Sequence, residues 1–193
     1  MQRRRGFTVL GVLGAAAGAG AQAINIEIAN PTLTPGESTL ITLTASYPAG
    51  DYAVAGIATE LVVNQIQGGL SDLQLIAPMD GPGTSAGTPG PGGITGIFAG
   101  QLNFPPAGIF ADDSNPIAFY SAMYTWDGSL SGPVLLDIET RTSRFDVYVE
   151  RDSARSESRL DGLIEGRGRI VIPAPAGTLV LGIGALALGR RRR

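Results

Sequence analysis

Carboxylates are the side chains in this sequence with the greatest capacity for acid–base or metal chemistry. The chain has 193 residues, with 17 Asp and Glu, no His and no Cys. Its 14 basic residues are all arginines, so lysine is absent as well. These absences exclude catalysis by a histidine-based triad, a thiolate nucleophile or a lysine Schiff base, and they exclude the usual histidine-coordinated metal centres.

Two kinds of site remain for the carboxylates. Paired acids could hydrolyse a glycosidic bond, and the candidate residues are Asp112, Asp113, Asp127, Asp137 and Glu139. The run Asp112-Asp113-Ser114-Asn115 could also offer hard oxygen ligands to calcium, but it lacks the full spacing of a calcium loop. Surface acids and a solvated acidic turn are the simpler interpretations. We therefore predict no catalytic residue, no metal site and no cofactor.

An aromatic segment near residues 119–126 is the third candidate site. Strand alternation would place Tyr120, Tyr124 and Trp126 on one face, with Phe119 and Met123 on the other. Exposed aromatic rings beside a groove lined by acids would indicate a carbohydrate-binding module or a carbohydrate-active protein. Buried rings would indicate a sandwich core, which is the interpretation we favour because aromatic residues anchor most such cores.

The charge of the central part of the chain differs from that of its ends. Residues 24–170 contain all 17 acidic residues and seven arginines, a net charge of −10, whereas the whole chain carries −3. A strongly acidic domain repels nucleic acids, so we predict no nucleic-acid partner. Without cysteine, the domain must be stabilised by its own core and not by disulfides.

Residues 24–170 show the alternation of apolar and polar residues that is typical of β-strands. We expect strands at 24–28, 38–47, 54–63, 73–77, 94–104, 117–126, 134–140, 144–149 and 169–172. Turn residues separate these short strands, which predicts a single all-β domain folded as a two-sheet sandwich. Residues 78–93 are rich in Gly and Pro, a composition that predicts a flexible loop. Residues 152–166 are polar and predict either a strand hairpin with an exposed face or a short helix.

A resemblance supports this fold. The run Asn30-Pro31-Thr32-Leu33-Thr34-Pro35-Gly36-Glu37-Ser38-Thr39, in which Pro35-Gly36 makes a turn before a threonine-rich strand, resembles the first hairpin of bacterial immunoglobulin-like and cohesin-like sandwiches. The resemblance implies a fold and not a function.

The N-terminus has the three parts of a signal peptide. Arg3, Arg4 and Arg5 precede an apolar segment at 7–19, and Ala21-Gln22-Ala23 forms an A-x-A cleavage site that predicts a mature start at residue 24. The run Arg4-Arg5-Gly6-Phe7 also matches the core of a twin-arginine signal. The general secretory and twin-arginine routes both remain open, and both export the protein.

The C-terminus combines a proline pair, an apolar run and a basic cluster. In the motif Pro173-Ala174-Pro175, the two prolines break secondary structure. The apolar residues 176–189 follow, and then Arg190, Arg191, Arg192 and Arg193, which favour the cytoplasmic side of a membrane. The 14 apolar residues would span about 21 Å as a helix, which is short for a bilayer. The predicted membrane-embedded residues are Ala176, Leu179, Val180, Leu181, Ile183, Leu186 and Leu188.

This order of features resembles the PEP-CTERM sorting domain, although Ala174 stands where that family usually has Glu. The resemblance implies processing by an exosortase-like enzyme, at least transient membrane anchoring, and a structural or adhesive role in the cell envelope or exopolysaccharide matrix. A surface polysaccharide is a further partner that this setting allows. A plain membrane anchor is the alternative for the tail. The predicted organisation is a signal peptide (1–23), a β-sandwich (24–170) and a sorting tail (171–193).

Overall fold

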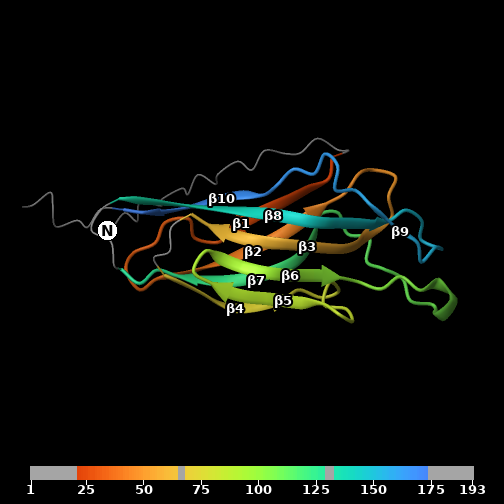
Figure 1. The fold of residues 1–193 in the computed structure, drawn as a ribbon, viewed down its shortest axis with the longest axis horizontal. Coiled ribbons are helices and arrows are strands. Elements are labelled where there is room, and N and C mark those ends of the chain that lie inside the picture. Colours follow the sequence, from red (N-terminus) through yellow and green to blue (C-terminus); the bar gives the residue numbers. More distant parts are fainter. Residues whose placement is uncertain (1–20, 65–67, 129–132, 174–193) are drawn as a thin grey trace, which may run out of the picture.

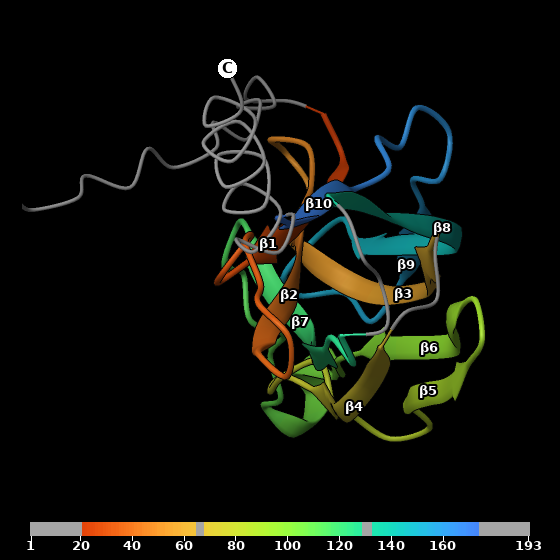
Figure 2. The same ribbon diagram turned by 90° about the vertical axis from the view of Figure 1, so that its left-hand side faces the viewer.

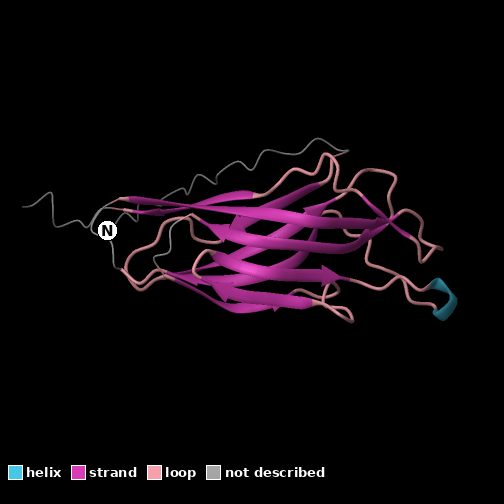
Figure 3. Ribbon diagram, viewed as in Figure 1, coloured by secondary structure: helices cyan, strands magenta, loops and turns pink. Residues whose placement is uncertain are grey.

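The computed structural model describes residues 21–64, 68–128 and 133–173, which form two facing β-sheets (Figure 1). The strands are β1 (Ala23–Ile28), β2 (Ser38–Ser46), β3 (Ala53–Val63), β4 (Gly69–Leu75), β5 (Ser85–Gly90), β6 (Gly93–Gly100), β7 (Ile117–Thr125), β8 (Val134–Tyr148), β9 (Ser156–Ser158) and β10 (Arg167–Ile172). A single turn of 3-10 helix, η1 (Pro105–Ala107), interrupts the connection from β6 to β7 (Figure 3). The predicted all-β sandwich is confirmed. Residues 1–20 of the predicted leader and residues 174–193 of the predicted tail lie outside the described residues.

The first sheet has the strand order β1-β2-β7-β4, and all its pairings are antiparallel. Strict alternation in β1 and β2 places one apolar set on the inner face, with Ile26 opposite Leu43 and Ile28 opposite Ile41. Because successive side chains of a strand point to opposite faces, the intervening polar residues face outward. The alternation read from the sequence thus determines the register of this hairpin.

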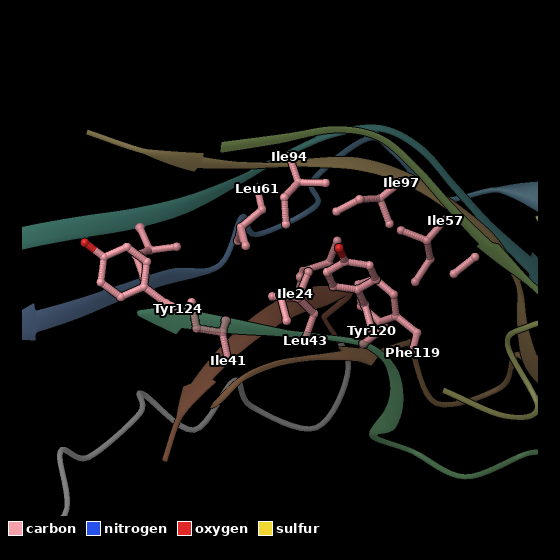
Figure 4. Packing of buried hydrophobic residues seen from close by; sticks show 14 of the residues in the cluster. Ile24, Ile41, Leu43, Ile57, Leu61, Ile94, Ile97, Phe119, Tyr120 and Tyr124 are labelled. Atoms are coloured by element: carbon pink, nitrogen blue, oxygen red, sulfur yellow. The ribbon is translucent and has the colours of Figure 1, made fainter. Parts of the chain in front are cut away.

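The second sheet has the order β10-β8-β3-β6-β5, with β9 paired to one end of β8. Figure 2 shows the two sheets packed face to face, with the edge strands β4 and β5 near each other. Side chains from both inner faces meet in one core, as Figure 4 shows for a part of it. Its members include Ile24, Ile41, Leu43, Phe119, Tyr120 and Tyr124 from the first sheet and Ile57, Leu61, Ile94 and Ile97 from the second.

The segment that resembles a cohesin-like first hairpin closes one end of the sandwich. Leu33 is fully buried, and its backbone N–H donates to the carbonyl of Val171 in β10, 3.1 Å away. Gly36 has a φ of 82°, a left-handed conformation that suits glycine, and its N–H donates to the carbonyl of Trp126. The connection from β1 to β2 therefore joins the edge of the second sheet to the first.

The prediction of a flexible loop at residues 78–93 is wrong. Residues 85–90 form β5, which pairs with β6 from Ser85 opposite Phe98 to Gly90 opposite Gly93. Glycine and proline lower the intrinsic strand preference of this segment. The segment lies at the sheet edge, where proline needs no ladder partner on its outer side, so tertiary pairing overrides the composition.

The predicted boundaries of three strands are also corrected. Residues 134–148 form one long strand, β8, and not two, because register shifts in its pairing with β3 let the strand bend without ending. Strand β6 ends at Gly100 instead of 104, and β4 spans residues 69–75 instead of 73–77. For residues 152–166 the hairpin alternative is correct, since β9 pairs with β8.

Candidate functional site

The candidate carboxylates Asp137 and Glu139 lie two residues apart on β8, and each is held by an arginine. The Nε of Arg169 lies 2.6 Å from an oxygen of Asp137, and the Nη2 of Arg141 lies 2.8 Å from an oxygen of Glu139. Glycoside hydrolysis needs one protonated carboxyl group in a sheltered site. Two partly exposed, ion-paired carboxylates do not provide that arrangement.

Among the other acidic candidates, Asp127 lies far from the neighbouring residues Asp112 and Asp113. Asp112 and Asp113 precede β7, whereas Asp127 follows it, and a nine-residue strand spans roughly 30 Å. Glycosidase carboxylates stand within about 10 Å of each other. Hydrogen bonds from the side chain and backbone of Ser114 lower the pKa of Asp112, which is the wrong direction for a general acid.

The run Asp112-Asp113-Ser114-Asn115 anchors a turn. The backbone N–H of Ser114 donates to a carboxylate oxygen of Asp112 at 2.8 Å. The amide of Asn115 bonds to both backbone groups of Tyr47, donating to its carbonyl and accepting from its N–H. Asp112 Oδ1 and Asn115 Oδ1 therefore accept backbone hydrogen bonds that stabilise the turn. Among the residues the structure describes, no group of three or more acidic side chains is suited to hold a metal.

The aromatic segment belongs to the core. Tyr124 and Trp126 are each 3% exposed, which is the outcome that favours a structural role over sugar stacking. Phe119 departs from the predicted alternation. It is fully buried, and so is the next residue, Tyr120, whereas alternation would place only one of the two in the core. The pairing of β2 with β7 shifts register at this point, and such a bulge inserts an extra residue that turns inward.

A small cleft lies between the two sheets beside Tyr124, with a volume of about 230 Å³. Its other lining residues are apolar or glycine, namely Val63, Gly68, Gly69, Leu70, Pro89, Gly90, Pro91 and Gly93. Among the described residues that line the cleft, none is a carboxylate or an arginine.

A row of paired charges on the second sheet was not foreseen in the sequence. All seven arginines of the described residues lie on or next to β8, β9 and β10. Their pairs include Arg141 with Glu139, Arg144 with Asp146, Arg155 with Glu157, Arg159 with Asp51 and Glu157, and Arg169 with Asp137. Several pairs are two residues apart, which is the spacing of neighbours on one face of a strand. Opposite charges two residues apart are the pattern from which the sequence could have predicted the ion pairs on the outer face of the second sheet.

Exposed ion pairs contribute little to stability, typically below about 1 kcal/mol each. Arg144 also lies over the ring of Phe98, 5.5 Å from its centroid. The outer face of this sheet is therefore a mixed-charge surface with local neutrality.

The predicted sorting motif lies at the limit of the described residues. Pro173 is exposed and directly follows β10, whereas Ala174, Pro175, the predicted membrane residues and Arg190, Arg191, Arg192 and Arg193 lie outside the described residues. Among residues 21–64, 68–128 and 133–173, no helix is long and apolar enough to cross a membrane.

The predicted signal-cleavage residues lie at the start of the sandwich. Ala23 is 1% exposed and begins β1, where it forms a parallel bridge with Ile164. The carbonyl of Gln22 accepts a hydrogen bond from the N–H of Ile164 at 3.2 Å, and the side-chain amide of Gln22 donates to the carbonyl of Asp161. Cleavage after Ala23 would remove these contacts from the folded domain.

A chain that begins at Ile24 is therefore expected to be less stable than one that begins at Gln22. The loss of the hydrogen bond to Ile164 and of the buried Ala23 should lower the free energy of unfolding by about 1–2 kcal/mol. Urea denaturation of the two chains, each released from a cleavable fusion, measures the difference. Gln22→Ala in the longer chain is the control, because it removes only the side-chain bond. Equal stability of the two chains would contradict the prediction.

Comparisons with known proteins show which solved structures have a similar fold. No protein-family model matches the sequence, and a search of curated proteins finds no match. Solved structures do match. A cohesin module from the family 33 glycoside hydrolase of Clostridium perfringens superposes with a TM-score of 0.52 at 12% identity, covering 81% of this chain and 99% of that module.

Two further cohesin structures agree. The seventh ScaB type I cohesin of Pseudobacteroides cellulosolvens has a TM-score of 0.54 at 13% identity, covering 79% of this chain and 94% of its own. A type I cohesin from a cohesin–dockerin complex of Clostridium thermocellum has a TM-score of 0.50 at 13% identity, covering 78% of this chain and 99% of its own. At such low identity the likeness concerns the fold alone. The class that fold and geometry define is a β-sandwich with the architecture of cohesin modules.

Proposed function

We propose that this chain is an exported cell-envelope protein whose sandwich is a non-catalytic protein-binding module with a structural or adhesive role. The observation that carries the proposal is the cohesin-type fold. In it, Asp137 and Glu139 form surface ion pairs and Asp112 anchors a turn. One of the solved neighbours forms a cohesin–dockerin complex, so its sandwich binds another protein. We transfer only that general role to this chain.

The proposal extends to the C-terminal region. Residues 173–193, which follow the end of β10 at Ile172, act as a PEP-CTERM-like sorting tail that holds the protein at the membrane at least until an exosortase-like enzyme cleaves it. What supports this part is the order of the proline pair, the apolar run and the arginine cluster, together with the exposed position of Pro173 after the last strand. An exposed, extended segment next to a folded domain is the form in which a processing enzyme can reach the chain.

The intact mass of the protein recovered from its native envelope tests this function. We expect a mass that ends near Pro175, with or without an added group. A mass that runs to Arg193 would mean a retained anchor and would contradict exosortase processing.

Two variants make the measurement sharper. Ala174→Glu restores the residue usual in the family and should raise the processed fraction. Pro175→Ala removes one of the two prolines and should lower it. If neither variant changes the processed fraction, the motif is not what the enzyme recognises.

A further inference from the structure

The loop from β6 to β7 exposes an unusual number of apolar side chains. Leu102, Phe104, Ile109 and Phe110 are each between 43% and 48% exposed, and they fall within nine residues of the chain. Phe104 and Ile109 lie opposite each other, because their backbones exchange hydrogen bonds of 2.8 and 3.3 Å. Single exposed apolar residues are ordinary, whereas a group of them marks an interaction site. We call residues 101–111 the apical loop.

Buried amide side chains hold the apical loop to the sandwich. Asn103 is 1% exposed, and its Nδ2 donates to the carbonyls of Arg151 and Ser153 at 3.0 and 2.8 Å. Its Oδ1 accepts the N–H of Ala111 at 3.0 Å. One side chain thus fastens both arms of the loop and the neighbouring connection from β8 to β9.

Gln101 and Tyr148 complete the attachment. The Nε2 of Gln101 donates to the carbonyls of Val54 and Asp112, and its Oε1 accepts the N–H of Asp112 at 2.7 Å. The hydroxyl of Tyr148 donates to the carbonyl of Gln101 at 3.0 Å and accepts the N–H of Asn103 at 3.2 Å. A fully satisfied buried network fixes the loop in one conformation, so the ordering entropy is lost on folding and not on binding.

Acidic residues surround the apolar side chains of the apical loop. Asp112, Asp113, Glu150 and Asp152 are exposed on this end of the sandwich. Arg151, which lies between Glu150 and Asp152, is placed over the ring of Phe110, 4.5 Å from its centroid. Apolar side chains with an acidic rim complement an apolar face with a basic rim.

The position of the apical loop suits a partner that lies away from the membrane. Ile172 pairs with Val134 at the start of β8, whereas the apical loop bonds to Tyr148 at its end. Figure 1 shows the loop with η1 at one end of the long axis and the end of β10 at the other. If the tail is held in the membrane, the apical loop faces outward.

We propose that the apical loop is the docking site for a protein partner that presents an apolar face rimmed by arginine or lysine. This rests on the proposed function as a binding module and names the surface that it uses. The acidic rim disfavours anionic lipid and nucleic acid. The alternative occupants, a membrane surface and a second copy of this chain, are outcomes of the test.

The absence of cysteine allows the loop to be probed directly. The full chain carrying Ala107→Cys, in which the four apolar side chains remain, is labelled with an environment-sensitive fluorophore at the exposed tip. It is titrated with a synthetic amphipathic helical peptide of leucine and lysine, and separately with the same peptide carrying glutamate for lysine. Leu135→Cys, exposed near the opposite end of β8, gives the matched control label.

We expect the lysine peptide to shift the fluorescence of the apical label and not that of the control label. Phe104→Ser with Ile109→Ser should weaken binding about tenfold or more at unchanged net charge, which is the loss typical of interface anchors. The double change Asp112→Asn with Asp152→Asn should weaken binding of the lysine peptide several-fold. The glutamate peptide should not bind. Circular dichroism checks that the variants, whose changes are exposed, melt as the parent does.

Three results would overturn the proposal. One is the absence of any shift with the lysine peptide, or a shift that the Phe104→Ser and Ile109→Ser changes leave intact. The second is a loop-dependent shift with phosphatidylcholine vesicles and no peptide, which would assign the loop to a membrane. The third is a loop-dependent shift that grows with protein concentration alone, which would assign it to a second copy. Peptide binding reported only by the control label would leave the binding module in place but move its site.

Discussion

Replacing Gly93 with alanine is expected to prevent stable folding of the sandwich. Gly93 has a φ of 131°, and a Cβ built there would lie 1.8 Å from the carbonyl oxygen of Leu61 on β3. No side chain tolerates that approach to backbone, so the hairpin of β5 and β6 would have to separate from β3. The combined strain and lost packing should cost roughly 3 kcal/mol or more. Thermal unfolding by circular dichroism measures the loss.

Gly92 supplies the matched control for this prediction. It precedes Gly93 in the same turn, and a Cβ built there meets nothing within 4 Å. Gly92→Ala should therefore change the free energy of unfolding by less than about 0.5 kcal/mol. If both variants keep the parent stability, residues 78–93 would behave as the flexible loop that their composition indicates, and the observed pairing would be wrong.

Alkaline conditions are expected to unfold the domain between pH 10 and pH 12. Burial, aided by nearby carboxylates, raises the pKa of Tyr47 and of Tyr124 to about 12 from the ordinary 10.0, and burial also raises the pKa of Tyr120. A raised pKa in the folded state means that the folded protein keeps the proton which the unfolded chain loses. The stabilisation is thus complete below pH 10 and is lost as the pH rises toward 12.

The expected loss is large for a single domain. Each tyrosine contributes a slope of about 1.4 kcal/mol per pH unit over its window. Tyr47 and Tyr124 together should lower the free energy of unfolding by about 5 kcal/mol across two pH units, which approaches the total stability of many domains. Urea titrations at several pH values, read by far-UV circular dichroism, give this slope.

Phenylalanine variants separate ionisation from packing. Tyr47→Phe removes the hydroxyl that donates to the carbonyl of Asp113, so it should lower stability by about 1 kcal/mol at pH 8. The same variant should also reduce the loss of stability above pH 10, because one ionising group is gone. An unchanged alkaline slope in this variant would show that Tyr47 does not carry the effect.

The strand pattern was largely readable from the sequence, and its failures have physical causes. β1, β2, β3 and β7 match their predicted ranges within two residues, because each alternates apolar and polar residues against one continuous core. β5 was missed because glycine and proline carry no strand signal by themselves. The inward position of Phe119 was missed because a bulge changes the alternation without any mark in residue type.

The candidate site was less predictable than the fold. The sequence drew attention to acids and aromatic residues, which proved to be ion pairs, turn anchors and core. Residues 101–104 of the apical loop were predicted as the end of the strand 94–104, and the exposure of the loop's apolar residues appeared only in the structure. Alternation cannot distinguish a buried strand from this exposed loop, because Leu102 and Phe104 alternate with polar neighbours as core residues do.

The amino-acid sequence by itself determined that this is an acidic all-β domain without histidine, cysteine or lysine chemistry, because composition and strand period are properties of the chain alone. Only the tertiary structure decided the order of strands in each sheet, the edge pairing of β5 and the exposure of the apical loop. The physical reason is that burial depends on what lies opposite a side chain. Ile94 and Ile97 on β6 face the first sheet, whereas Phe104 and Ile109 extend beyond the end of both sheets (Figure 1) and remain open to a partner.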